Sequence, residues 1–221
     1  MAHLRFALLL ALSAHSLALA VTPPCHTPLN PDLETLCYTT TTTAGNVTVR
    51  VIGAGVDGVL VTGMSSPTNF SLGSRASATP VFEYFLSDND RFTKIPLTVP
   101  LMFRPDPAGT WLASFALPTS VYASAAAAPG LVPGTDARFE EFAAAPGAGR
   151  TVAALTFWTI NLAAEEDYAA ACAALEAALP GMGLAPVAGA WREAWVTYSG
   201  MAMVGDMVNE CWVEVAPSAA L

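Results

Sequence analysis

The sequence is poor in charged side chains and in histidine, which limits the catalytic chemistry it can support. Of its 221 residues only 12% are charged, against 53% that are hydrophobic. His3 and His15 lie in the first twenty residues, so His26 is the only histidine in the rest of the chain. A Ser–His–acid triad needs a histidine base, and His26 lies in a proline-rich stretch. G-x-S-x-G and P-loop motifs are absent from the sequence. We therefore expect a protein that is not an enzyme.

Basic side chains are also scarce. Nine lysines and arginines face eighteen acidic residues, which gives a formal net charge of -9. A surface of this charge repels phosphate groups, so nucleic acid and anionic lipid are poor partners.

The first twenty residues predict a secretory signal peptide. Arg5 precedes an apolar run at residues 7–19, and Ala18-Leu19-Ala20 supplies the small residues of a cleavage site. An uncleaved anchor is the alternative, but the run is shorter than the ~20 residues of a bilayer span, and no later segment is expected to cross a membrane. Cleavage would remove one arginine and no acid, leaving eight basic against eighteen acidic side chains and moving the charge from -9 to -10.

All four cysteines follow the expected cleavage site. An even number in a secreted chain predicts two disulfides. Of the three connectivities we favour Cys25 with Cys37, which are close in sequence, and Cys172 with Cys211, which fall on elements that could touch. No C-x-x-C spacing is present, so we expect no structural metal.

Two N-x-S/T sequons become meaningful if the chain is secreted. Asn46 precedes Val47-Thr48, and Asn69 precedes Phe70-Ser71. Both are predicted glycosylation sites on surface loops.

Hydrophobic patterning predicts a mixed chain of short strands and two helices. Residues 21–35 are expected to form a proline-rich tail, residues 65–75 a loop, and residues 120–134 a loop between two halves or a flap over a pocket. A hairpin is expected between residues 136–142 and 150–160. The predicted strands are residues 37–43, 47–51, 56–62, 95–102, 111–117, 136–142, 150–160, 185–190, 193–198 and 210–215.

The first helix is expected at residues 81–86, where apolar side chains recur on one face, with Pro80 in its first turn and Ser77 or Thr79 as its cap. The second helix has a clearer signature. Asn161 can cap it, acids at 165–167 suit its first turn, and Pro180-Gly181 ends it. Its apolar stripe is Tyr168, Cys172, Leu175 and Leu179.

Residues 81–89, VFEYFLSDN, followed by KIPLTVPL at 94–101, resemble the SOUL heme-binding protein family. In that family a pattern like L-F-x-Y-I-x-G-x-N leads into K-I-x-M-T-x-P-V. Asp88 stands here in place of the glycine and Leu97 in place of the methionine. The segments ASFALP at 113–118, WVTY at 195–198 and NECWV at 209–213 are similar to later family landmarks.

The resemblance implies an α+β fold, a distorted antiparallel β-barrel built from two strand-helix-strand repeats and flanked by two α-helices. It assigns residues 36–216 to one heme-binding domain, with a short tail at 217–221. It also implies that the protein, which residues 1–20 predict to be secreted, binds heme or another porphyrin in an apolar cleft beside the first helix.

Such a ligand needs apolar walls, cations for its propionates and, optionally, an axial donor. The candidate walls are Phe82, Phe85, Met102 and the aromatic strand from Trp195, although core packing explains each of them more simply. The candidate cations are Arg75, Lys94 and Arg104. Met201, Met203 and Met207 could supply a thioether, while His26 could ligate iron only by folding back. We therefore expect weak heme binding.

Two alternatives stay open. A secreted interaction protein could have kept the fold and lost heme binding. An enzyme acting on a small apolar ligand could use Glu210 and Tyr198, although Glu210 within an apolar strand could also be a hydrogen-bonded structural acid. The acids Glu140, Glu141 and 165–167 are better explained as solvated faces and a helix start.

Overall fold

The computed structural model describes residues 25–27, 30–52, 59–106, 108–122, 124–141, 150–188, 193–198 and 206–217. Within them the chain is an α+β protein, with two α-helices and a large sheet whose strands pair antiparallel throughout. The strands of this ten-stranded sheet are β3 (Tyr38–Ala44), β4 (Val47–Ile52), β5 (Val59–Met64), β7 (Leu101–Pro105), β8 (Trp111–Ala116), β9 (Ala137–Glu141), β10 (Arg150–Ile160), β11 (Leu184–Pro186), β12 (Glu193–Thr197) and β13 (Asp206–Pro217).

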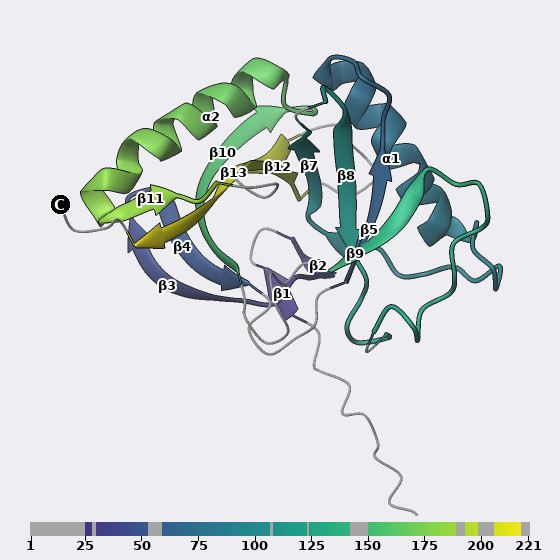
Figure 1. The fold of residues 1–221 in the computed structure, drawn as a ribbon. Coiled ribbons are helices and arrows are strands. Elements are labelled where there is room, and N and C mark those ends of the chain that lie inside the picture. The colour runs from purple at the N-terminus through teal and green to yellow at the C-terminus, as the bar shows by residue number, and fades with distance from the viewer. Residues whose placement is uncertain are drawn as a thin grey trace, which may run out of the picture.

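The strands lie in the order β3-β4-β10-β13-β12-β7-β8-β5-β9, and β11 pairs with β13. No pairing joins the edge strands β3 and β9 within the described residues, so the sheet is open. The expected barrel is therefore wrong as to closure, although the coarser α+β class is confirmed. Figure 1 shows that the sheet is strongly curved, with both helices on its outer side.

Both faces of the sheet are packed. On the outer face, helix α1 (Phe70–Leu86) contacts β5 and β8, and helix α2 (Glu165–Ala178) contacts β10 and β13. On the inner face a second cluster of buried side chains includes Met102, Val196 and Trp212. Burial on both faces explains why β8 is buried at every position although only alternate residues predicted it.

The N-terminal segment is an integral part of the fold, which corrects the expected tail. β1 (Cys25–Thr27) and β2 (Asn30–Thr35) pair antiparallel, and β2 pairs in parallel with β6 (Thr98–Val99). Figure 1 shows this pair on the inner side of the curved sheet. Leu36 belongs to the inner cluster, and Leu33 packs against it. The segment contains prolines, which disfavour strands, and its strands are too short to show an alternating pattern.

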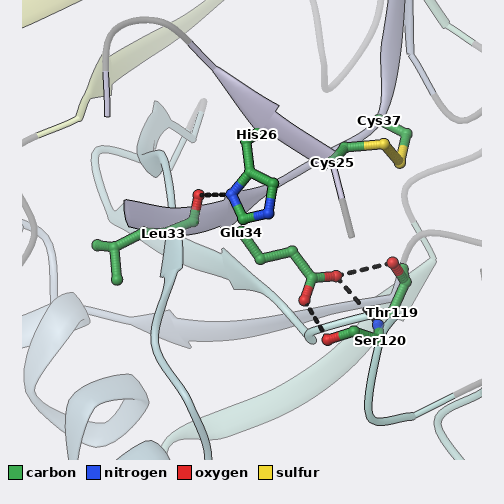
Figure 2. The surroundings of a disulfide bond; sticks show 7 residues. All are labelled: Cys25, His26, Leu33, Glu34, Cys37, Thr119 and Ser120. Carbon is green, nitrogen blue, oxygen red and sulfur yellow. Dashed lines mark hydrogen bonds between the residues drawn. A yellow bond between two sulfur atoms is a disulfide. The ribbon is translucent and has the colours of Figure 1, made fainter. Parts of the chain in front are cut away.

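A carboxylate fastens the same segment to a distant loop, as Figure 2 shows. Glu34 accepts hydrogen bonds from the Thr119 hydroxyl at 2.8 Å and from the Ser120 backbone N–H at 3.1 Å, and also from the Ser120 hydroxyl. The His26 ring is exposed, with Nδ1 3.2 Å from the Leu33 carbonyl oxygen.

Both predicted disulfides are confirmed. Cys25 and Cys37 have Cα atoms 5.2 Å apart and close the β1–β2 hairpin onto the segment before β3. Cys172 and Cys211 have Cα atoms 5.3 Å apart and join α2 to β13. The expected contact between these two elements therefore exists.

Helix α1 begins at Phe70, well before the expected caps Ser77 and Thr79, so the predicted loop at 65–75 is wrong from residue 70 onward. Asn69 caps it, because its side-chain oxygen accepts from the Leu72 N–H at 3.2 Å. Pro80 lies inside the helix, and Ser77 is no cap, since its hydroxyl donates to the Gly73 carbonyl at 2.7 Å. Serine, threonine and glycine have modest helix propensity, which hid the first half of α1 from the sequence analysis.

Two glycines let α1 lie directly on the sheet. A Cβ atom at Gly63 of β5 would collide with the Ser77 carbonyl oxygen. A Cβ atom at Gly73 would collide with the Trp111 ring on β8. Neither position tolerates a side chain at this spacing between helix and strands.

Helix α2 follows the prediction closely. Tyr168, Cys172, Leu175 and Leu179 are all buried. The cap position is Ala164 rather than Asn161, and the Asp167 carboxylate accepts from the Ala164 N–H at 2.9 Å. A 3₁₀ turn, η1 (Leu179–Met182), follows the α-helix.

Three further strand predictions need correction. β9 pairs with β5, while β10 pairs with β4 and β13, so the two strands do not form the expected hairpin. The single strand expected at 95–102 is divided into β6 and β7. The last strand, β13, is longer than the expected 210–215 and includes Met207.

Candidate functional site

A cleft of about 780 Å³ runs along helix α1, on the side that faces the start of helix α2. One wall is a stripe of the helix at i, i+3, i+4, i+7, i+8 and i+11, and the opposite wall is formed by residues 162–166. With a rise of 1.5 Å per residue, this stripe is about 17 Å long. Its side chains are Ser71, Ser74, Arg75, Ala78, Thr79 and Phe82.

The bottom of the cleft rests on an aromatic cluster. Phe70 and Phe103 line it, with ring centroids 5.5 Å apart in an edge-to-face arrangement. Behind them lie three further aromatic rings. The centroid of the Phe70 ring is 4.9 Å from that of Trp111, 5.0 Å from that of Trp195 and 5.8 Å from that of Tyr168. Aromatic pairs in this geometry stabilise one another, so the side chains at the bottom of the cleft are held in place without a ligand.

The rim of the cleft is charged. Arg75 is the one cationic side chain among the described residues that line it, and Glu165 and Glu166 are its acidic ones. All three side chains are exposed, and none belongs to an ion pair among the described residues. The cleft can therefore hold an apolar body and meet one anionic group at Arg75.

The cleft includes two of the predicted site residues, Arg75 and Phe82. The Phe82 ring is half-buried and also contacts Phe115 at 5.1 Å. The structure places Phe85 in the outer core and Met102 in the inner cluster, on opposite faces of the sheet. Neither lines the cleft.

The remaining predicted residues are dispersed. Lys94 is exposed beside a smaller pocket of about 330 Å³ near the end of α1. Met207 is fully buried on β13, opposite Thr159. Met201 and Met203 lie outside the described residues.

Arg104, the third predicted cation, is buried on the inner face and ion-paired. Its Nη2 atom lies 2.6 Å from the Glu140 carboxylate, which also accepts from the Thr62 hydroxyl at 3.1 Å. Burial lowers the pKa of Arg104, and the hydrogen bond that Arg104 donates to Glu140 opposes that shift. The positive charge of the Arg104 guanidinium is therefore already compensated by Glu140.

Glu210 and Tyr198 belong to a hydrogen-bonded cluster on the same inner face. The Glu210 carboxylate accepts from Arg50, Thr156, Tyr198 and Trp212, at distances between 2.6 and 2.9 Å. Burial, followed by the charge of Glu210, raises the pKa of Tyr198 well above its usual value. This geometry corresponds to the structural interpretation of Glu210.

The sequence analysis missed Phe70, Phe103 and the wall at residues 162–166. Phe70 fell in the expected loop at 65–75, and no local pattern distinguishes Phe103 from any other buried strand residue. These residues meet only through the packing of α1, β7 and the segment before α2. A helix prediction extended to Asn69 would have found Phe70.

Residues 53–58, GAGVDG, match the pattern G-x-G-x-x-G. The motif binds dinucleotides when it follows a strand and opens a helix. Here it connects β4 to β5, and its six residues lie outside the described part of the chain. The element that follows is a strand, so the context of the motif is missing.

The two sequons occupy different surroundings. Asn46 is exposed in the turn between β3 and β4, as expected. Asn69 is exposed at the start of α1 and lines the cleft.

Among the described residues, no group of three or more His, Cys, Asp or Glu side chains could hold a metal ion. The described lining of the cleft also contains no His, Cys, Met or Tyr, the side chains that ligate heme iron. Neither described helix has the length and apolar character needed to cross a bilayer.

Comparisons with known proteins bear on the fold. No family profile matches the chain, and no curated protein matches its sequence. Among solved structures, the crystal structure of the EcmrR C-terminal domain matches with a TM-score of 0.51 over 81% of this chain and 98% of that chain. The two sequences are 9% identical, so the likeness concerns the fold alone.

Proposed function

We propose that the protein is a secreted, non-catalytic binding protein whose cleft along α1 holds a planar apolar ligand, with heme or another porphyrin as the first candidate. The observation that supports this most is the aromatic bottom of the cleft, formed by Phe70 and Phe103. The volume of about 780 Å³ falls in the range of roughly 300–1,000 Å³ that is usual for small-ligand sites.

The lining fits a porphyrin ring better than it fits heme iron. Phe82 and Ala78 offer apolar contact, and Arg75 can pair with one propionate. The described lining supplies no axial ligand, and Glu165 and Glu166 would repel a second anionic group. We therefore propose binding through the ring, without coordination of iron from these walls.

Secretion is part of the proposal and is supported by the two disulfides, which persist in oxidising compartments. The segment at residues 1–20 lies outside the described residues, so its role as a signal peptide stays a prediction. Mass spectrometry of the protein released by a eukaryotic host would give the first residue of the mature chain.

Titration with hemin and with metal-free protoporphyrin IX tests the ligand. We expect saturable absorbance changes for both, with dissociation constants within about threefold of each other, because iron contributes little. Failure of both to saturate at micromolar concentration would contradict the proposal. A dissociation constant for hemin much below that of protoporphyrin IX would contradict ring-only binding.

Matched substitutions of two exposed cations test the location. Arg75→Gln should weaken binding by about three- to tenfold, whereas Lys94→Gln should leave it unchanged, because only Arg75 lines the cleft. Glu165→Gln should strengthen binding. Equal effects of the two cation substitutions would remove the cleft from the proposal.

A second candidate function, protein interaction, is favoured by a separate apolar surface. Trp158 and Ile160 are 68% and 78% exposed, and as i and i+2 residues they lie on the same face of β10. Pairing between β10 and β4 ends at Leu155, so this end of β10 lacks β4 as a neighbour. Intact folding without any porphyrin binding would favour this candidate.

A further inference from the structure

The sequon at Asn69 lies at the cleft, which neither its sequence nor the expected surface loop indicated. Asn69 and Ser71, the first and third residues of the sequon, both line the cleft at the N-terminal end of α1. Both are exposed. The other sequon, at Asn46, lies in the β3–β4 turn and is not among the cleft residues.

The two side-chain atoms of Asn69 are used differently. Oδ1 caps α1 by accepting from the Leu72 N–H at 3.2 Å. No described residue accepts a hydrogen bond from Nδ2, the atom to which an N-linked glycan attaches. The cap and a glycan are therefore compatible on one residue.

We propose that Asn69 carries an N-linked glycan that partly covers the cleft and restricts the entry of ligands. The modification rests on secretion, and its effect on ligands rests on the proposed binding function. In the reaction, the Asn69 amide nitrogen loses a proton and forms a bond to C1 of the first sugar. The bond from C1 to the lipid diphosphate donor breaks, and the lipid diphosphate leaves. A transferase of the secretory pathway catalyses this transfer while the chain is still unfolded.

The position of the glycan determines its effect. The first sugar is bulky and polar and begins at one end of a cleft that is about 17 Å long along the helix. The acidic rim at Glu165 and Glu166 lies on the opposite wall. A glycan there shields that rim and shortens the open part of the cleft, while the end near Phe82 stays accessible.

Three variants separate the glycan from the residues that carry it. Ser71→Ala destroys the sequon and keeps the Asn69 cap. Asn69→Asp also prevents glycosylation and keeps a capping oxygen. Ser71→Thr preserves the sequon and changes the same cleft position. Asn46→Gln removes the glycan remote from the cleft.

The experiment uses full-length protein secreted from a eukaryotic host. Peptide mass spectrometry first shows whether Asn69 is occupied. Carbodiimide labelling then measures the accessibility of Glu165 and Glu166, with the exposed Glu83 of α1 as the internal reference. We expect labelling of the two rim acids to rise by about twofold or more in Ser71→Ala and Asn69→Asp, with no change in Ser71→Thr or Asn46→Gln.

Hemin titration of the same proteins gives the effect on binding. We expect affinity to rise by about three- to tenfold in Ser71→Ala, whereas Asn69→Asp is left out of this comparison because its carboxylate adds a negative charge to the cleft. An unoccupied Asn69, or equal labelling with and without its glycan, would overturn the inference. Absence of hemin binding in every form, together with the expected labelling, would contradict the proposed function and leave the glycan shield standing.

Discussion

Arg50 and Glu210 form a buried, bidentate ion pair that reaches across the strand between them. Arg50 lies on β4 and Glu210 on β13, and β10 pairs with both strands. Nη1 lies 2.7 Å from Oε2, and Nη2 lies 2.7 Å from Oε1. Burial tends to lower the pKa of Arg50, but the hydrogen bond and charge of Glu210 raise it above its usual value. The Arg50 guanidinium therefore stays charged at physiological pH.

Removing one member of this pair should be far more damaging than removing both. Glu210→Leu or Arg50→Met leaves a buried charge uncompensated, which costs about 3–5 kcal/mol of unfolding free energy. The double variant Arg50→Met/Glu210→Leu should lose less than the sum of the single losses. Denaturant unfolding of the four proteins measures the coupling. Additive losses would show that the pair makes no cooperative contribution.

Three buried tyrosines should make the protein sensitive to alkali. Burial raises the pKa of Tyr84, Tyr168 and Tyr198 above the usual value of 10. Their neutral form is favoured in the folded state, so the stability they confer is complete below pH 10 and is lost as pH rises through their folded-state pKa values. We expect the melting temperature to fall steadily above pH 10.

Tyr84→Phe provides the control for this dependence. It removes one titrating group, so the loss of stability with pH above 10 should become shallower by about 1.4 kcal/mol per pH unit. The Tyr84 hydroxyl donates to the Pro129 carbonyl at 2.8 Å, so some stability is lost at all pH values. An unchanged slope would show that Tyr84 does not contribute to the alkaline transition. Absorbance of tyrosinate follows the ionisation directly.

Local sequence patterns predicted the elements whose signals are themselves local. Tyr168, Cys172 and Leu175 formed a helical stripe behind an acidic first turn, and α2 matched it, with Leu179 following in the 3₁₀ turn. The first turns of α1 contain Ser71, Gly73 and Ser74, whose helical state depends on packing against β5 and β8. Tertiary contacts outweigh propensity there.

The same distinction applies to strand partners and to the cleft. Nothing in the local sequence of β9 indicates that it pairs with β5. Val59 of β5 and Glu141 of β9 lie opposite each other, although more than seventy residues separate them in the sequence. Family resemblance pointed to a cleft beside the first helix, and two of the residues selected for it, Arg75 and Phe82, line the cleft along α1. It also selected Met102 and Arg104, because a strand pattern does not state which face of the sheet a ligand would occupy.

The close approach of α1 to the sheet can be tested at Gly63. Gly63→Ala places a Cβ atom against the Ser77 carbonyl oxygen, and backbone must move to accommodate it. We expect a loss of at least about 1–3 kcal/mol in unfolding free energy. Gly181→Ala is the matched control, because a Cβ there meets no atom within 4 Å. Equal stability of the two variants would show that α1 does not lie this close to β5.

The two disulfides should contribute differently to stability. Cys172 and Cys211 are 39 residues apart and Cys25 and Cys37 only 12, so loop-closure entropy predicts losses of about 4 and about 3 kcal/mol when each pair is replaced by alanine. Without the Cys172–Cys211 disulfide, hydrogen exchange should rise in α2 and β13, the two elements that it joins. Without the Cys25–Cys37 disulfide, the rise in hydrogen exchange should be confined to β1 and β2, because β3 retains its pairing with β4. Faster exchange in α2 after loss of Cys25–Cys37 would show instead that the N-terminal segment supports the whole sheet through Leu33 and Leu36.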